Sequence, residues 1–266
     1  MFSLKNELKE FLDKKADFYN HPSFIETDPI LIPHQFSLKQ DIEIMGFFAA
    51  SLAWGQRKTI IAKCFELAER MDGSPYQFVT QHNDEGLQSL LGFKHRTFND
   101  TDLLYFVDFL HRHYRCFDSL EDAFLQNGAF LSIEDSLTGF NRYFFDHENA
   151  PRRTQKHVAT PARKSACKRL NMFLRWMVRN DDKGVDFGIW KRIPQSALVC
   201  PIDVHVNRTA RKLGLISREQ ADWKAALELT ENLRVLDAQD PAKYDFALFG
   251  LSIEKEIYQN KPLISG

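Results

Sequence analysis

The sequence predicts an all-α protein. Apolar residues recur three and four positions apart along most of the chain, whereas alternating strand patterns are nearly absent. Capping residues, glycines and prolines separate these stretches, which indicates about ten to twelve helices joined by short loops. The chain has 266 residues, of which 44% are hydrophobic and 27% charged. This composition provides a buried core and excludes a chain that is disordered throughout.

The first half of the chain contains several helix starts. Ser37 followed by Gln40 has the form of a capping box and predicts a helix to about Ala53, which Gly55 ends. The next expected starts are Gln56, Ser74-Pro75, Asn99, Ser119 and Ser132. The polar residues 146–160 have the weakest helical pattern.

The second half predicts four further helices. One covers residues 165–179, and another covers residues 204–213 and is closed by Gly214. Ser217 with Gln220 is expected to open a helix to about Val235, and Asp240-Pro241 is expected to open the last one.

We expect these helices to form two lobes. A central lobe would contain residues 40–198. A terminal lobe would join residues 1–39 to residues 199–266, and the whole can also be counted as one domain of residues 1–266.

The net charge of −1 conceals an asymmetry. Residues 151–180 contain nine Lys or Arg and no Asp or Glu, which leaves −10 on the rest of the chain. Lys168, Arg175 and Arg179 are spaced by seven and four, so they share one helix face. Such a stripe can follow a phosphate backbone, which makes nucleic acid one of two candidate partners. The alternative is a solvated basic face that pairs with acidic helices.

The cysteines are scattered and suggest neither a disulfide framework nor a metal site. Cys64, Cys116, Cys167 and Cys200 predict thiols in a reducing cytoplasm, without a zinc or iron–sulfur centre. We expect no cofactor and no metal. The first residues become charged at once, and the longest apolar stretch, residues 44–54, is too short to cross a membrane. A cytoplasmic protein without membrane contact is therefore expected, and its oligomeric state is left open.

The most distinctive segment is CPIDVHVNRTARKLGL at residues 200–215. Asp203 precedes a helix start, where its carboxylate can cap the helix and meet the positive end of the dipole. His205 and Arg208 follow on that helix. From this local pattern alone, a structural cap with a solvated charged face explains the segment.

Two motifs resemble a known superfamily. IDVHVNR at residues 202–208, followed by KLGL at 212–215, resembles the V-D-T-H-V-x-R…R-L-G-L signature of the helix-hairpin-helix (HhH-GPD) DNA glycosylases. Endonuclease III, adenine glycosylases and 8-oxoguanine glycosylases belong to this superfamily. FFAASLAWGQR at residues 47–57 resembles its L-x-x-x-x-L-S-Q-Q-T entry helix. Over essentially the whole chain, the sequence also resembles the uncharacterised bacterial DUF2400 family, through residues 168–179, 185–190 and 240–250.

The glycosylase resemblance implies a two-lobed helical fold with a cleft between the lobes, and DNA repair by release of a flipped, damaged or modified base. It places the catalytic carboxylate, which stabilises an oxocarbenium-like sugar or activates water, at Asp203. Members with lyase activity add a lysine that forms a Schiff base with C1′. The usual position of that lysine is not matched here, and Lys168 is the first substitute, ahead of Lys164 and Lys191.

The sequence also departs from the superfamily. The L-P-G-V-G hairpin is replaced by DDKGVDFGIW at residues 181–190, where Gly184 and Gly188 allow only a degenerate hairpin. The four-cysteine cluster is missing. The expected nucleic-acid contacts are Gln56, Arg57, Lys164, Arg169, Arg175, Arg179, Trp176, Trp190, His205 and Arg208.

Several alternatives stay open. Core packing is the competing role for Trp176 and Trp190, and a cap and a packing partner are the expected roles of Asp240 and Asp245. Two other functions compete with an active N-glycosylase: a nucleic-acid-binding protein of the same fold without catalysis, and a helical protein–protein adaptor.

Overall fold

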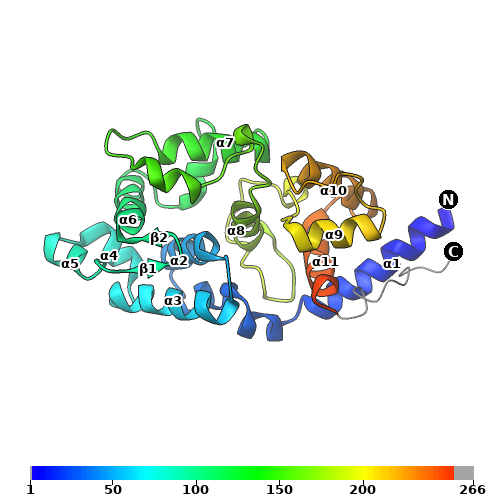
Figure 1. The fold of residues 1–266 in the computed structure, drawn as a ribbon, viewed down its shortest axis with the longest axis horizontal. Coiled ribbons are helices and arrows are strands. Elements are labelled where there is room, and N and C mark those ends of the chain that lie inside the picture. Colours follow the sequence, from blue (N-terminus) through cyan, green and yellow to red (C-terminus); the bar gives the residue numbers. More distant parts are fainter. Residues whose placement is uncertain (1, 255–266) are drawn as a thin grey trace. The chain divides into compact units, whose positions relative to one another are not determined.

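The computed structural model describes residues 2–254, which consist mainly of α-helices and short 3-10 helices (Figure 1). The α-helices are α1 (Phe2–Tyr19), α2 (Lys39–Leu52), α3 (Arg57–Arg70), α4 (Pro75–Gln81), α5 (Asp84–Gln88), α6 (Asp100–Tyr114), α7 (Ile133–Phe144), α8 (Lys168–Val178), α9 (Val204–Lys212), α10 (Trp223–Leu236) and α11 (Tyr244–Ile253). The 3-10 helices are η1 (Pro22–Thr27), η2 (Pro29–Leu31), η3 (Pro33–Gln35), η4 (Leu120–Phe124), η5 (Arg152–Lys156), η6 (Pro161–Arg163), η7 (Gln195–Ala197) and η8 (Pro241–Lys243). Within the described range, the strands are β1 (Lys94–His95) and β2 (Phe98–Asn99), which pair antiparallel. The all-α prediction is confirmed.

Several caps predicted from the sequence are confirmed. Asn99 begins α6 through a reciprocal capping box with Asp102. Ser132 accepts from the backbone N–H of Asp135 and begins α7. Asp203 caps α9 in the same way. Each of these polar side chains satisfies backbone donors that the first turn of a helix leaves unpaired.

Other predicted starts are wrong in position or type. Helix α2 follows Leu38 and has no side-chain cap, so Ser37 does not open it. Ser119 caps only the 3-10 helix η4. Helix α10 is capped by Asp222 because the Ser217 hydroxyl donates to Glu228 instead, and the helix starts later than expected.

Two compact units make up the chain. One contains Ile25–Ala159, and the other contains the described parts of Met1–Phe24 and Thr160–Gly266. The division therefore assigns residues 160–198 to the terminal unit rather than the central one. The physical reason is that Arg175 of α8 and Arg179 at its end are buried against Asp240, Asp245 and Phe246 near the end of the chain. Position 1 and positions 255–266 of the expected terminal lobe lie outside the described residues.

The Ile25–Ala159 unit has an aromatic core. Phe47 of α2 stacks on Phe106 of α6 with ring centroids 5.2 Å apart, and Phe144 of α7 meets Phe106 edge-on at 4.9 Å. Residues 42–52 of α2 are buried without exception, which makes α2 the central helix of this unit. Much of the unusually high phenylalanine content is used here.

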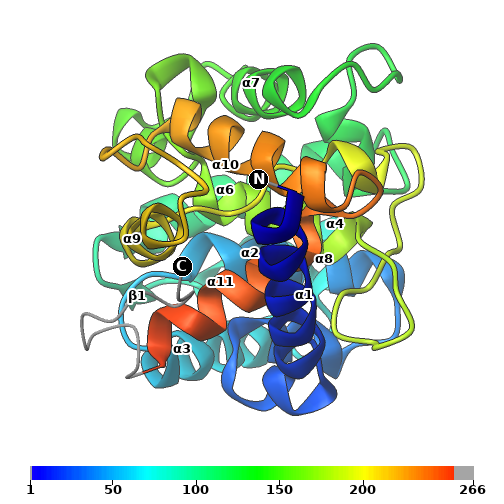
Figure 2. The same ribbon diagram turned by 90° about the vertical axis from the view of Figure 1, so that its right-hand side faces the viewer.

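The other unit contains α1 and α8 to α11. Helices α1 and α11 lie side by side (Figure 2), and α11 also packs against α9. Trp176 of α8 is completely buried, and Trp190 is 1% exposed and meets Phe173 edge-on at 5.3 Å. The core role of both tryptophans is thus confirmed, and their expected stacking on a nucleobase is not available in this structure.

The segment that follows α8 does not form a helical hairpin. Residues 181–190 form bends and irregular backbone, and the backbone N–H of Trp190 bonds to the carbonyl of Met177 at 2.9 Å. Gly188 has a φ of +56°, and a Cβ there would lie 2.6 Å from Cβ of Asn180. The glycine thus lets the segment fold closely back on the end of α8.

Candidate active site

Asp203 holds its carboxylate at the N-terminus of α9. Its Oδ1 accepts hydrogen bonds from the backbone N–H groups of His205 and Val206, both at 2.9 Å. Because the carboxylate has two oxygens, this cap leaves Oδ2 for another partner. The local sequence Asp-Val-His therefore determines where the acid sits.

Lys168 supplies the partner. Its Nζ lies 3.3 Å from Oδ2 of Asp203, although the two residues are 35 positions apart in the sequence. Lys168 is the first residue of α8, whose preceding residue, Cys167, turns the chain through a φ of +49°. About 30% of each side chain remains exposed, so the pair is accessible to solvent. Both members belong to the same compact unit.

The environment keeps Asp203 ionised. Burial alone would raise the pKa of its carboxyl, but the positive charge of Lys168 and the N–H groups of Val206 and His205 outweigh it. The pKa therefore lies below its ordinary value, and Asp203 is an anion at neutral pH. An ionised carboxylate can stabilise the positive charge that develops on a sugar. It can also hold the neighbouring lysine amine close to that sugar.

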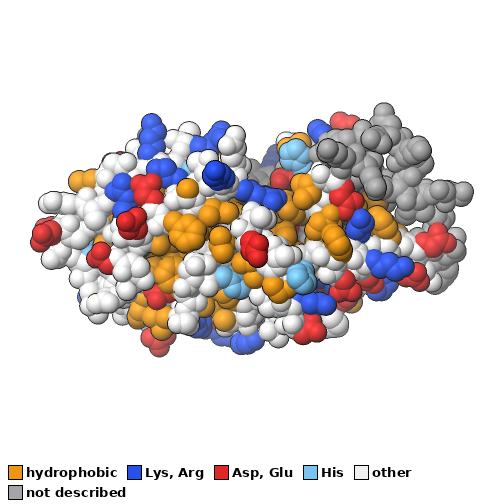
Figure 3. Space-filling model, turned by 90° about the horizontal axis from the view of Figure 1, so that it is seen from below, with side chains coloured by type: hydrophobic (Ala, Val, Ile, Leu, Met, Phe, Trp, Pro, Cys, Tyr) orange, Lys and Arg blue, Asp and Glu red, His pale blue; other side chains and the backbone are white. Residues whose placement is uncertain are grey.

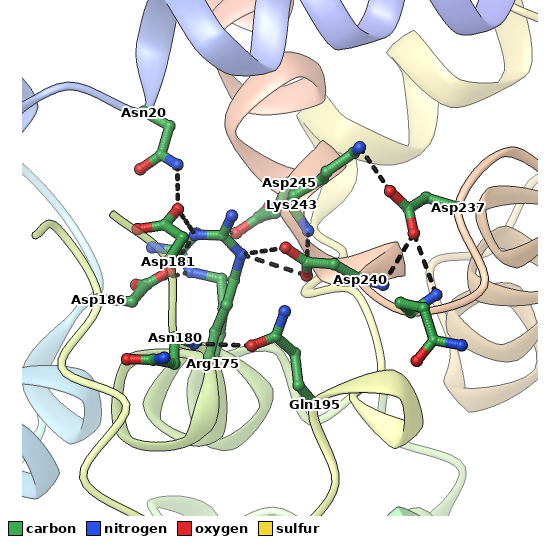
Figure 4. Close-up of polar contacts among 12 residues, drawn as sticks. Asn20, Arg175, Asn180, Asp181, Asp186, Gln195, Asp237, Asp240, Lys243 and Asp245 are labelled. Atoms are coloured by element: carbon green, nitrogen blue, oxygen red, sulfur yellow. Dashed lines mark hydrogen bonds and ion pairs between the residues drawn. The ribbon is translucent and has the colours of Figure 1, made fainter. Parts of the chain in front are cut away.

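The expected basic stripe on α8 is not formed. The exposed fraction of Arg175 and of Arg179 is only 3%. Arg175 donates through Nε to Asp186 at 3.2 Å and through Nη1 to Asp245 (Figure 4). The guanidinium also lies over Phe246, 4.3 Å from the ring centroid. Arg175 is therefore a buried structural residue.

Arg179 has the same role one turn further along. Its guanidinium contacts Asp181 at 2.8 Å, Asp186 at 3.1 Å and Asp240 at 2.9 Å. Burial would lower its pKa, but these carboxylates raise it above the ordinary value. Assigning Arg175 and Arg179 to nucleic acid was wrong, because buried charges need partners and both find them among aspartates.

The other predicted contacts differ in exposure. Gln56, at the start of α3, and Lys164 are exposed, as are His205 and Arg208 on α9. Arg57 is half-buried. Arg169 is also half-buried, and desolvation lowers its pKa to about 10. On the face drawn in Figure 3, the described Lys and Arg side chains are interspersed with Asp and Glu.

Asp245 is a residue of the site that could not be identified from the sequence. It was expected only to pack, and its bond to Arg175 confirms that role in part. Its carboxyl is buried, and the charges of Lys168 and Asp203 both act on its pKa. No spacing in the sequence indicates that Asp245 of α11 is electrostatically coupled to Lys168 of α8 and to Asp203 before α9. Asp240 caps η8 as expected, through the backbone N–H of Lys243.

One comparison with known proteins gave a match. The model of a family described as a protein of unknown function, DUF2400, matches residues 28–254. The chain belongs to the DUF2400 family. The match covers the α8, α9 and α11 segments that carry Lys168, Asp203 and Asp245. For this DUF2400 protein, neither the curated proteins nor the solved structures provided a match.

Two further properties of this DUF2400 protein bear on the site. Within residues 2–254, no helix is both long and apolar enough to span a membrane. In the same range, His, Cys, Asp and Glu side chains form no group of three or more arranged to hold a metal ion.

Proposed function

We propose that this protein is a DNA glycosylase-like enzyme of the HhH-GPD type, which releases a damaged or modified base by breaking an N-glycosidic bond. The pair formed by Lys168 and Asp203, with 3.3 Å between Nζ and Oδ2, carries the proposal. The carboxylate stands at the position that the V-D-T-H resemblance assigns to the catalytic acid. Lys168, which lies outside the segment that replaces the superfamily's hairpin, is next to that carboxylate.

The two side chains have complementary roles in such a reaction. As the bond between C1′ and the base lengthens, positive charge develops on the sugar, and the ionised Asp203 stabilises it. In the lyase route, Lys168 first loses a proton to solvent and its amine attacks C1′. The electron pair of the C1′–N bond leaves with the base, which takes up a proton. Opening of the sugar ring at O4′ then gives the iminium.

Exposed residues around the pair suit a nucleic-acid strand. Val204, the first residue of α9, is 63% exposed, and His205 and Arg208 are exposed on the same helix. Lys164 is exposed in the turn before α8. An apolar side chain and cations beside a catalytic carboxylate offer contacts to a base and to phosphates.

Base release and covalent trapping test the proposal. The full chain is incubated with a panel of lesion-bearing oligonucleotides, and strand cleavage after alkali reports base release. Borohydride, which reduces an iminium to a stable amine, reports a Schiff base. We expect one lesion at least to be processed, Asp203→Asn to abolish release, and Lys168→Ala to abolish the trapped adduct. Lys224→Ala is the matched control, because Lys224 is an exposed lysine of the same unit that has no expected role in the reaction.

The possible outcomes separate the proposal from its main alternative. Base release that persists in Asp203→Asn contradicts the role of the carboxylate. Salt-dependent DNA binding without release on any lesion contradicts the enzyme and favours a nucleic-acid-binding protein. Residues 181–190 form no helical hairpin, so in both cases a DNA phosphate must be held by residues other than those of the superfamily's hairpin.

A further inference from the structure

A second carboxyl, that of Asp245, is linked to the helices that carry Lys168 and Asp203. Asp245 is the second residue of α11, a helix that packs against α9. The exposed fraction of Asp245 is 6%, so solvent screens its charge poorly. Its hydrogen-bond partner is Arg175, which shares α8 with Lys168. The two catalytic candidates and Asp245 thus come from three elements that meet in one unit.

We propose that Asp245 is a positioning residue of this site, whose buried carboxylate supplies the negative charge that the pair by itself lacks. In the pair, Lys168 neutralises Asp203, so the two together offer little net charge to a cationic sugar. An ionised Asp245 gives the three residues a net charge of −1, and a protonated Asp245 leaves them neutral. The inference rests on the proposed function, because only a cationic transition state benefits from this excess.

The surroundings of Asp245 support coupling to the pair. The charged and titratable groups that act on Asp245 or contact its helix include Arg175, Arg179 and Lys168 from α8 and its end, and Asp203 before α9. Others are Cys200, Asp240 and Lys243 at η8, and Asp13, Lys15 and Tyr19 of α1. Lys243 is held by Asp13 at 3.1 Å and by Asp237 at 2.6 Å, so its charge is already balanced. Arg175 is shared with Asp186 and neutralises Asp245 only in part.

The titration of Asp245 follows from this position. Burial, aided by the negative charge of Asp203, raises the pKa of its carboxyl to about 6. The positive charges of Arg175 and Lys168 lower the pKa but do not outweigh burial. The carboxyl is therefore mostly ionised at neutral pH and gains a proton in mildly acidic solution. Because coupling between charges is reciprocal, changing either member of the pair must move this titration, in opposite directions.

Carbon-13 NMR of the aspartate carboxyls tests the coupling without a substrate. In the wild-type full chain, Asp245 is expected to titrate near pH 6. Lys168→Met removes a positive charge and should raise the midpoint, whereas Asp203→Asn removes a negative charge and should lower it. A shift of about half a pH unit or more is expected in each case. Arg211→Ala, an exposed charge near the C-terminal end of α9, is the matched control and should leave the midpoint unchanged.

The pH profile of base release tests the role. Wild-type activity should fall as pH decreases through about 6, and the step should be absent in Asp245→Asn. A midpoint for Asp245 that does not move in either pair variant overturns the inference. The NMR titration does not use Asp245→Asn, so its result is independent of whether that variant folds. Opposite shifts of the midpoint in a protein that releases no base would instead contradict only the proposed function.

Discussion

Replacing Asp203 by Asn separates the two roles of this side chain, because Asn keeps the cap and loses the charge. Asn is as good an N-cap as Asp, and its side-chain oxygen can still accept from His205 and Val206. What disappears is the negative charge, and with it the ion pair to Lys168 at 3.3 Å. Ala at the same position removes both.

The structure sets the expected sizes of these effects. Since about 30% of both side chains is exposed, solvent screens the pair, and its loss costs about 0–1 kcal/mol of unfolding free energy. Leaving the backbone N–H donors of His205 and Val206 without their carboxylate acceptor in Asp203→Ala costs about 1–2 kcal/mol in total. The effect on base release should be much larger, about a hundredfold or more for both variants, because it concerns charge in the transition state.

Urea unfolding measures the stability of each variant, and single-turnover base release measures its chemistry. A clear loss of activity in Asp203→Asn with near wild-type stability supports the catalytic role. The reasoning is refuted if Asp203→Asn releases base at the wild-type rate while Asp203→Ala is destabilised, since Asp203 would then be only a helix cap.

Four further predictions follow from the same contacts. Arg175→Met should lower the unfolding free energy by about 3–5 kcal/mol, because it removes the guanidinium partner of the buried Asp245 and one of the two arginine partners of Asp186; a urea midpoint close to wild type would contradict this. Arg208→Ala should weaken DNA binding and reduce the slope of log K against log salt by about one, as titrations at several salt concentrations would report. Gly188→Ala should cost about 1–3 kcal/mol, measured by thermal or urea unfolding, because φ is +56° and a Cβ would clash with Asn180. Finally, the pKa of Asp245 is raised from 3.8 to about 6, so its contribution to stability is complete below pH 3.8 and is lost as pH rises through 6. Asp245→Asn should therefore gain stability relative to the wild type as pH increases over this range, in urea unfolding at a series of pH values; a constant difference would contradict the assignment.

Local sequence patterns predicted those features whose partners are close in the chain. Asn99 and Asp203 cap their helices through N–H groups two or three residues away, so their role could be read from the sequence. Ser217 failed as a cap because Glu228, eleven positions on, binds its hydroxyl. The local sequence pattern around Ser217 contains no information on this contact with Glu228.

The charge pattern led to a wrong prediction for Arg175 and Arg179 for the same reason, because some of their partners lie far away in the sequence. Counting Lys and Arg in residues 151–180 identifies a basic segment correctly, but the count contains no information on which side chains face solvent. The carboxylates that surround Arg175 and Arg179 are spread from Asp181 to Asp245, and the chain must fold before they meet.

By itself, the sequence determined the helical class, several helix ends and the placement of Asp203 at a helix start, because propensity, periodicity and capping act over a few residues. Only the tertiary structure decided which of the basic residues became buried partners and which remained exposed. It also brought Lys168 to Asp203 and buried Asp245 where their charges act on it. Burial and electrostatic coupling depend on distances in space, which neighbours in sequence do not report.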